Sequence, residues 1–128
     1  MELPSQVKLV EVGPRDGLQN QPVTVSITHR VELIERLAKA GLKKIEAGSF
    51  VSPKWVPQMA GTDLVLDRLN GNQSLIKDTG VRYAALTPNL KGLEGAIQHR
   101  AGEVAIFSAA SESFTQKNIN CSIKESLQ

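Results

Sequence analysis

The chain has 128 residues, of which 41% are hydrophobic and 22% charged, and its net charge at pH 7 is +2. This composition predicts one globular domain, and the scattered basic residues argue against a nucleic-acid partner. The lone cysteine, Cys121, excludes an internal disulfide, and the lack of an apolar run of about 18 residues argues against a membrane partner. With no signal or transit peptide pattern, we expect a cytoplasmic protein.

The first third of the chain predicts a strand, a helix and a second strand. Residues 7–12 are an apolar run that ends at a Gly-Pro turn, and residues 43–47 are a similar short run. Between them, residues 26–40 place Ile27, Val31, Ile34 and Ala38 on one helical face. Ser26 is the expected N-cap, and Gly41 is the expected stop.

The remaining elements continue this alternation of strand and helix. The patterns predict a helix near 58–70 closed by Asn70-Gly71, a strand at 81–86, a helix at 90–100, a strand at 103–108, a polar loop at 111–120 and a helix capped by Ser122. Strands separated by helices predict a parallel α/β sheet.

Two architectures fit this order, an open doubly wound sheet and part of a (β/α)8 barrel. No Gly-x-Gly-x-x-Gly turn follows the first strand, which weakens the dinucleotide-binding version. Polar residues instead follow every predicted strand, where a barrel has its catalytic face. A complete barrel needs roughly 200 residues or more. We therefore expect the N-terminal part, about four βα units, of a TIM barrel in residues 1–128, with its C-terminal half missing.

A cation and an anion, Arg15 and Asp16, stand side by side where the first predicted strand ends. Asp16 is either a hard oxygen ligand for a divalent cation or a carboxylate that caps the following loop. Arg15 offers a fixed fork of donors to a developing oxyanion, or else forms a surface pair with Asp16. Because consecutive residues leaving a strand point in different directions, we do not expect this pair to form.

The stretches Val12-Gly-Pro-Arg-Asp-Gly-Leu-Gln-Asn20, Ser49 to Gln58, Leu86 to Gly92 and Phe114 to Ser122, with Glu46, resemble the hydroxymethylglutaryl-CoA lyases. These are metallolyases on a TIM barrel of the pyruvate carboxyltransferase type. The resemblance implies cleavage of a CoA thioester, 3-hydroxy-3-methylglutaryl-CoA, to acetyl-CoA and acetoacetate with Mg²⁺ or Mn²⁺. We also expect a homo-oligomer. It makes Asp16 a metal ligand, and Arg15 a catalytic and substrate-binding residue.

Three further residues receive roles from this pattern. Glu46 lies on an apolar strand, where a carboxylate is costly unless it is paired, so we expect it to assist catalysis by holding Arg15 or a metal-bound water. Gln19 and Ser49 are expected to bind substrate, with a backbone-satisfying loop role equally open for each. The two histidines, His29 and His99, are expected on exposed helix faces.

The chain also departs from the family pattern. A His-x-His pair, an Asn ligand and a Cys on a glycine-rich loop have no match here, so we expect the isolated chain to be inactive. Two alternatives stay open. One is a Claisen-type synthase or aldolase of the same superfamily, and the other is a non-catalytic half-barrel that associates with another chain through its open sheet edge.

Overall fold

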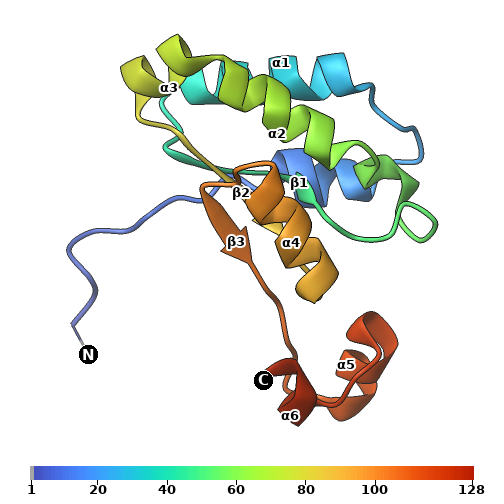
Figure 1. Ribbon diagram of the computed structural model, residues 1–128. Helices are drawn as coiled ribbons and strands as arrows, with labels where there is room; N and C mark the ends of the chain where they lie inside the picture. The colour runs from blue at the N-terminus through green and yellow to red at the C-terminus, as the bar shows by residue number, and fades with distance from the viewer. Residues whose placement is uncertain (1) are drawn as a thin grey trace.

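A computed structural model describes residues 2–128, and its centre is a three-stranded parallel sheet (Figure 1). The strands are β1 (Lys44–Ser49), β2 (Arg82–Leu86) and β3 (Glu103–Ala105), hydrogen-bonded in that order. Both neighbouring pairs run parallel, and a helix lies between consecutive strands in the chain. The predicted parallel α/β sheet is therefore confirmed.

Three helices cover one side of this sheet: α1 (Ile27–Lys39), α2 (Thr62–Gly71) and α3 (Gln73–Thr79) (Figure 1). The core between these helices and the sheet contains Ile34, Ala38, Ile45, Ala47, Val65, Leu66, Leu69, Leu75, Val81, Tyr83 and Ala85. A fourth helix, α4 (Leu90–Gln98), follows β2 and buries its small residues Gly92 and Ala96. Across residues 2–128, none of the helices has the length and apolarity that crossing a bilayer requires.

The helix predicted at 26–40 forms with the expected ends. The Ser26 hydroxyl accepts a hydrogen bond from the His29 amide at 3.2 Å, and Gly41 after the helix has a φ of 106°. The helix predicted near 58–70 begins later, at Thr62, after a 3-10 turn at Pro57–Met59. Helix α3 was not predicted, because Asn70-Gly71 indicates a chain reversal, whereas the Asn72 side chain caps a second helix.

The strand predicted at residues 7–12 is wrong except at one residue. Glu11 forms a single parallel bridge with Ile45: its amide donates to the Lys44 carbonyl at 2.9 Å, and its carbonyl accepts from the Glu46 amide at 2.8 Å. Val7 and Leu9 are exposed, and no described residue pairs with this segment on its other side. An apolar run becomes a strand only where a ladder partner satisfies its backbone, and here the partner extends over one bridge.

Residues 103–128 correct two further predictions. Strand β3 ends at Ala105 instead of continuing to 108, and Ile106 is exposed. The predicted loop at 111–120 is a helix, α5 (Glu112–Ile119), because the Ser111 hydroxyl accepts from the Phe114 amide and starts it.

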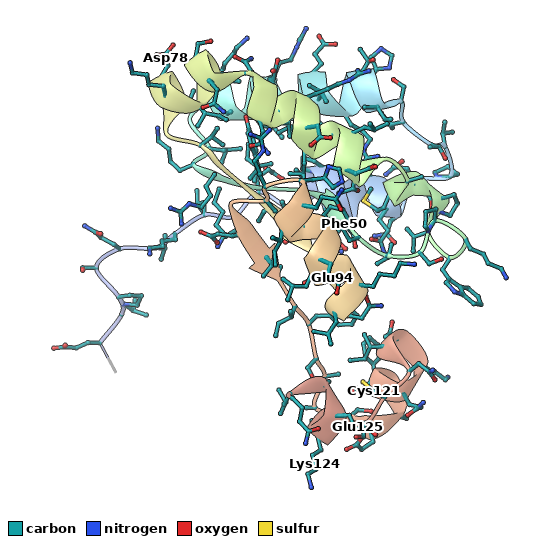
Figure 2. All side chains as sticks on the ribbon, in the orientation of Figure 1. Phe50, Asp78, Glu94, Cys121, Lys124 and Glu125 are labelled. Atoms are coloured by element: carbon teal, nitrogen blue, oxygen red, sulfur yellow. The ribbon has the colours of Figure 1, made fainter. Side chains whose placement is uncertain are left out.

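The helix predicted after Ser122 is present as α6 (Ile123–Ser126), with a reciprocal capping box between Ser122 and Glu125. Figure 1 shows α5 and α6 beside each other and apart from the sheet and its covering helices. Cys121, Lys124 and Glu125 all lie in this separate part (Figure 2). Cys121 is a free, half-buried cysteine.

Candidate active site at the carboxyl edge of the sheet

A π-helical turn, Gly13–Gly17, carries the first two candidate residues to the carboxyl end of the Glu11 bridge. The amides of Arg15 and Asp16 both donate to the Val12 carbonyl, at 3.1 and 2.7 Å. The Glu11 carboxylate accepts from the Gly13 amide at 2.7 Å and so satisfies a donor at the start of the turn. The turn is therefore fixed to the backbone beside β1, and its side chains have defined positions.

Arg15 and Glu46 form the closest charged contact at this edge. The Arg15 Nε donates to Glu46 Oε1 at 2.5 Å, and the two side chains are 18% and 8% exposed. A charge-assisted bond between partly buried groups is stronger than a surface pair, because less water competes for either charge. The structure thus brings together two residues, 31 positions apart in the chain, that the sequence assigned to catalysis.

Asp16 also contacts the guanidinium, which corrects the prediction that this pair would not form. Its Oδ1 lies 3.2 Å from Arg15 Nη1. Successive side chains diverge by about 180° along a strand but by only about 100° along a helix, and Arg15 and Asp16 are in a helical turn. The Asp16 side chain is 57% exposed, so its carboxylate is accessible from solvent.

Asp16 is the one predicted metal ligand, and the donor set around it is small. Among residues 2–128 no group of three or more His, Cys, Asp or Glu side chains is placed to hold a metal ion. Mg²⁺ takes one or two protein carboxylates and fills its other positions with water or substrate oxygens, so one exposed carboxylate fits part of such a site.

The two predicted substrate-binding residues lie in different environments. Ser49 is 1% exposed, and its hydroxyl donates to the Leu86 carbonyl at 3.4 Å, so it already has a partner in β2. Gln19 is half-buried, and its Oε1 is buried without a hydrogen-bond partner among residues 2–128. A free acceptor of this kind is able to take a donor from a ligand. Both roles stay predictions.

The side chains that support Glu46 were missed by the sequence analysis. Strand β1 shifts register between Glu46 and Gly48, and Thr62 at the start of α2 packs over Gly48. The one available signal was Gly48 itself, because a glycine inside an apolar strand suggests a bulge or a close approach.

The histidines behave differently from each other. His29 is exposed, as predicted, but His99 is half-buried: its Nδ1 lies 3.0 Å from Asp67 Oδ1, and its ring stacks on Phe50 with centroids 6.4 Å apart. Phe50 lies where the sheet meets α4 (Figure 2). His99 therefore belongs to the packing of α4 against α2, which corrects the expectation of an exposed side chain.

An open pocket of about 590 Å³ lies between the loops that follow β1 and β2 and the end of α5. Its lining includes Trp55, Asn89, Lys117 and Asn120, and the Trp55 side chain is 81% exposed. Asn89 also caps α4 by accepting from the Gly92 amide. Arg15, Asp16 and Glu46 are not among the residues that line it, so the pocket is separate from the charged cluster.

A family model described as HMGL-like matches residues 6–128. The chain belongs to the HMGL-like family. Among curated members, it is 55% identical over 128 residues to a 3-hydroxy-3-isohexenylglutaryl-CoA/hydroxy-methylglutaryl-CoA lyase of Pseudomonas aeruginosa, covering 100% of this chain and 41% of that protein. It is 56% identical over 126 residues to the mitochondrial hydroxymethylglutaryl-CoA lyase of Homo sapiens, covering 98% of this chain and 37% of the human protein.

Solved HMGL-like structures have the same fold. The crystal structure of hydroxymethylglutaryl-CoA lyase from Pseudomonas aeruginosa superposes with a TM-score of 0.85 at 55% identity, over 99% of this chain and 40% of that one. An HMG-CoA lyase from Acinetobacter baumannii in complex with coenzyme A and 3-methylmalate gives 0.84 at 34% identity, again over 99% and 40%. The chain thus spans about two fifths of these relatives, and the prediction of a partial barrel is confirmed.

Proposed function

We propose that this chain contributes Arg15, Glu46 and Asp16 to an active site that cleaves 3-hydroxy-3-methylglutaryl-CoA to acetyl-CoA and acetoacetate. The observation that carries the proposal is the 2.5 Å contact between Arg15 and Glu46, with Asp16 beside it, in a chain 55% identical to such a lyase. Residues 1–128 would form the N-terminal part of a single barrel domain.

The proposed reaction is a retro-Claisen cleavage. The C3 hydroxyl loses its proton to solvent, its oxygen forms the ketone of acetoacetate, and the C2–C3 bond breaks. The electrons of that bond move onto the thioester carbonyl as an enolate, and a proton from solvent then added at C2 gives acetyl-CoA. Arg15 retains donors beyond the Nε that Glu46 occupies, and its permanent positive charge stabilises the enolate oxygen. Glu46 holds the guanidinium plane in one orientation, so little reorganisation is needed as charge develops.

A divalent cation, Mg²⁺ or Mn²⁺, fits the proposal through Asp16. Its exposed carboxylate would hold the ion, which when bound acidifies the substrate hydroxyl. Gln19 would accept a hydrogen bond from the substrate, because its Oε1 has no partner among residues 2–128. Ser49 would bind substrate only after its hydroxyl rotates away from the Leu86 carbonyl.

We also propose that the chain associates with a second copy. Leu90, Ile97, Ile106 and Phe114 have exposed fractions of 78%, 67%, 73% and 56%, and β3 has no strand on its outer side among residues 2–128. Apolar surface next to an open strand edge favours pairing with a similar edge. Sedimentation at micromolar concentration tests this: a dimer is expected, and a stable monomer contradicts it.

Cytoplasmic location stays a prediction, because the relatives include mitochondrial as well as bacterial proteins.

The activity is tested in a chimera in which residues 6–128 replace the matched segment of the Pseudomonas aeruginosa lyase. With Mg²⁺ or Mn²⁺ present, we expect cleavage of the CoA ester within about tenfold of the parent enzyme, a difference of about 1.4 kcal/mol in transition-state stabilisation. Circular dichroism and sedimentation of the parent are the controls for folding. A chimera that folds like the parent yet condenses acetyl-CoA with 2-oxo acids, or performs neither reaction, contradicts the proposal.

A further inference from the structure

Strand β1 contains a bulge directly after Glu46. Glu46 pairs with Ala84 and Gly48 pairs with the next residue of β2, Ala85, so Ala47 is an extra residue. A bulge breaks the alternation of side chains along a strand and re-aims those next to it. Ala47 belongs to the core under the helices, and a Cβ on Gly48 would also point toward α2. Two successive residues therefore face the helices, while Glu46 reaches Arg15.

Thr62 occupies the space beside the bulge. A Cβ at position 48 would lie 2.5 Å from Thr62 Oγ1 and 2.7 Å from its Cγ2, so only glycine fits at this position without displacement. The same Oγ1 accepts from the Ser49 amide at 3.2 Å and donates to the Met59 carbonyl at 2.8 Å. The hydroxyl thus supplies a partner to a strand amide that follows the bulge.

The buried side chain of Arg30 donates a hydrogen bond to Thr62. Its side chain is among the largest fully buried ones, at 1% residue exposure, and Nη2 donates to Thr62 Oγ1 at 3.2 Å while Nη1 donates to the Ala60 carbonyl at 2.7 Å. No carboxylate pairs with it among residues 2–128, and its Nε has no partner there. A buried guanidinium without a carboxylate is costly unless it is hydrogen-bonded. The two hydrogen bonds that Arg30 donates hold the turn at 59–62 in one position.

We propose that Thr62, held by Arg30, is a positioning residue that fixes the β1 bulge and thereby aims Glu46 at Arg15. It acts through Gly48 and the Ser49 amide and touches neither charged residue. That the Arg15–Glu46 pair serves catalysis rests on the proposed function. The geometric claim does not, and it is testable on the chain itself.

The test follows the side-chain Nε–Hε resonance of Arg15 by nuclear magnetic resonance, assigned by its loss in Arg15→Lys. A hydrogen bond to a carboxylate shifts this proton and slows its exchange with water. Thr62→Val keeps the side-chain volume and removes the hydroxyl, and we expect the resonance to move to the position of a free arginine or to be lost by exchange. Thr62→Ser keeps the hydroxyl and should retain the resonance.

The control is Thr115→Val, which removes the hydroxyl of another buried threonine, in α5, and should leave Arg15 unchanged. An unchanged Arg15 signal in Thr62→Val, or equal loss in Thr62→Val and Thr62→Ser, overturns the proposal. If Thr62→Val does not fold, Gly48→Ala decides by the same signal. Loss of the Arg15 resonance in that chain supports the proposal, and a wild-type resonance overturns it. These readouts require no activity, so failure here is distinct from failure of the proposed function.

Discussion

The body of the molecule, residues 11–105, and the C-terminal region that follows it, residues 106–128, differ in what their apolar side chains contact. In the body, Ile34, Ile45, Val65, Leu66 and Leu69 are all 0% exposed. In the C-terminal region, Ile106, Phe114 and Leu127 are more than half exposed, and α5 packs mainly on α6. The same kind of residue is thus buried where the chain supplies both layers and exposed where it supplies one.

This contrast shows that an apolar pattern predicts a need for a partner and does not show where the partner comes from. The catalytic candidates lie on the body side of the boundary, held by β1 and the turn before α1. In the solved relative from Pseudomonas aeruginosa the matched segment is 40% of the chain, so that protein has further polypeptide outside this segment. Three measurements on this chain test the difference between the body and the C-terminal region.

The largest expected effect comes from truncating one apolar side chain in each region. Leu66→Ala removes a fully buried side chain of α2 and should cost about 2–5 kcal/mol in the free energy of unfolding. Ile106→Ala removes a side chain that is 73% exposed and should change that free energy by less than about 0.5 kcal/mol in the monomer. Urea unfolding followed by circular dichroism measures both. Equal costs for the two variants would remove the distinction between the regions.

A smaller effect comes from raising the pH. Burial, and secondarily the Glu35 charge, raises the pKa of Tyr83 to about 12. An unfolded chain loses this proton near pH 10, so in the interval from about 10 to 12 the folded state binds more protons and its stability falls as pH rises. Because Tyr83 is the only tyrosine, its absorbance titration reports the body alone. A folded-state midpoint near 10 would mean that the ring is not buried as described.

The smallest effect compares two carboxylates. Hydrogen bonds from Lys44 and Arg82 lower the pKa of Glu103, and hydrogen bonds from Ser122 lower the pKa of Glu125. A lowered pKa stabilises the fold above the ordinary glutamate range, and this contribution is lost as pH falls through the folded-state value.

Only Glu103 links side chains of β1 and β2 to β3, whereas Glu125 caps a short terminal helix. We therefore expect Glu103→Gln to flatten the acid limb of the unfolding curve of the body and Glu125→Gln to leave it unchanged. Acid titration followed by the circular dichroism signal of the sheet and helices checks this. If Glu125→Gln moves the curve as much as Glu103→Gln, the terminal helix is coupled to the body.

Local patterns predicted the elements that local interactions decide. Ser26 and Gly41 bound α1 because a cap and a left-handed glycine act within a few residues. At residues 111–120 the polar composition predicts a loop, whereas the Ser111 side chain caps helix α5. The strand predicted at residues 7–12 was wrong for another reason, because the strand that would pair with it is set by tertiary structure.

The candidate site was predictable in its residue types and not in its geometry. A buried carboxylate requires a partner, so the sequence predicted that Glu46 holds Arg15 or a metal-bound water, and the structure shows the contact with Arg15. The contact between Arg15 and Asp16 depends on a π-helical turn that no local sequence pattern predicted. The bulge after Glu46 has Thr62 of α2 packed beside it, and this tertiary contact is not visible in a local pattern.

In the proposed reaction, the guanidinium of Arg15, held by Glu46, stabilises negative charge during cleavage of the CoA ester. The most direct measurement is the turnover rate of Arg15→Lys in the chimera with the Pseudomonas aeruginosa lyase, beside Arg36→Lys, which alters an exposed pair with Glu32. Loss of an oxyanion-stabilising group predicts a fall of about 10²-fold or more for Arg15→Lys, with an unchanged circular dichroism spectrum and a normal rate for Arg36→Lys. A near-normal turnover rate in a folded Arg15→Lys chimera would contradict the account.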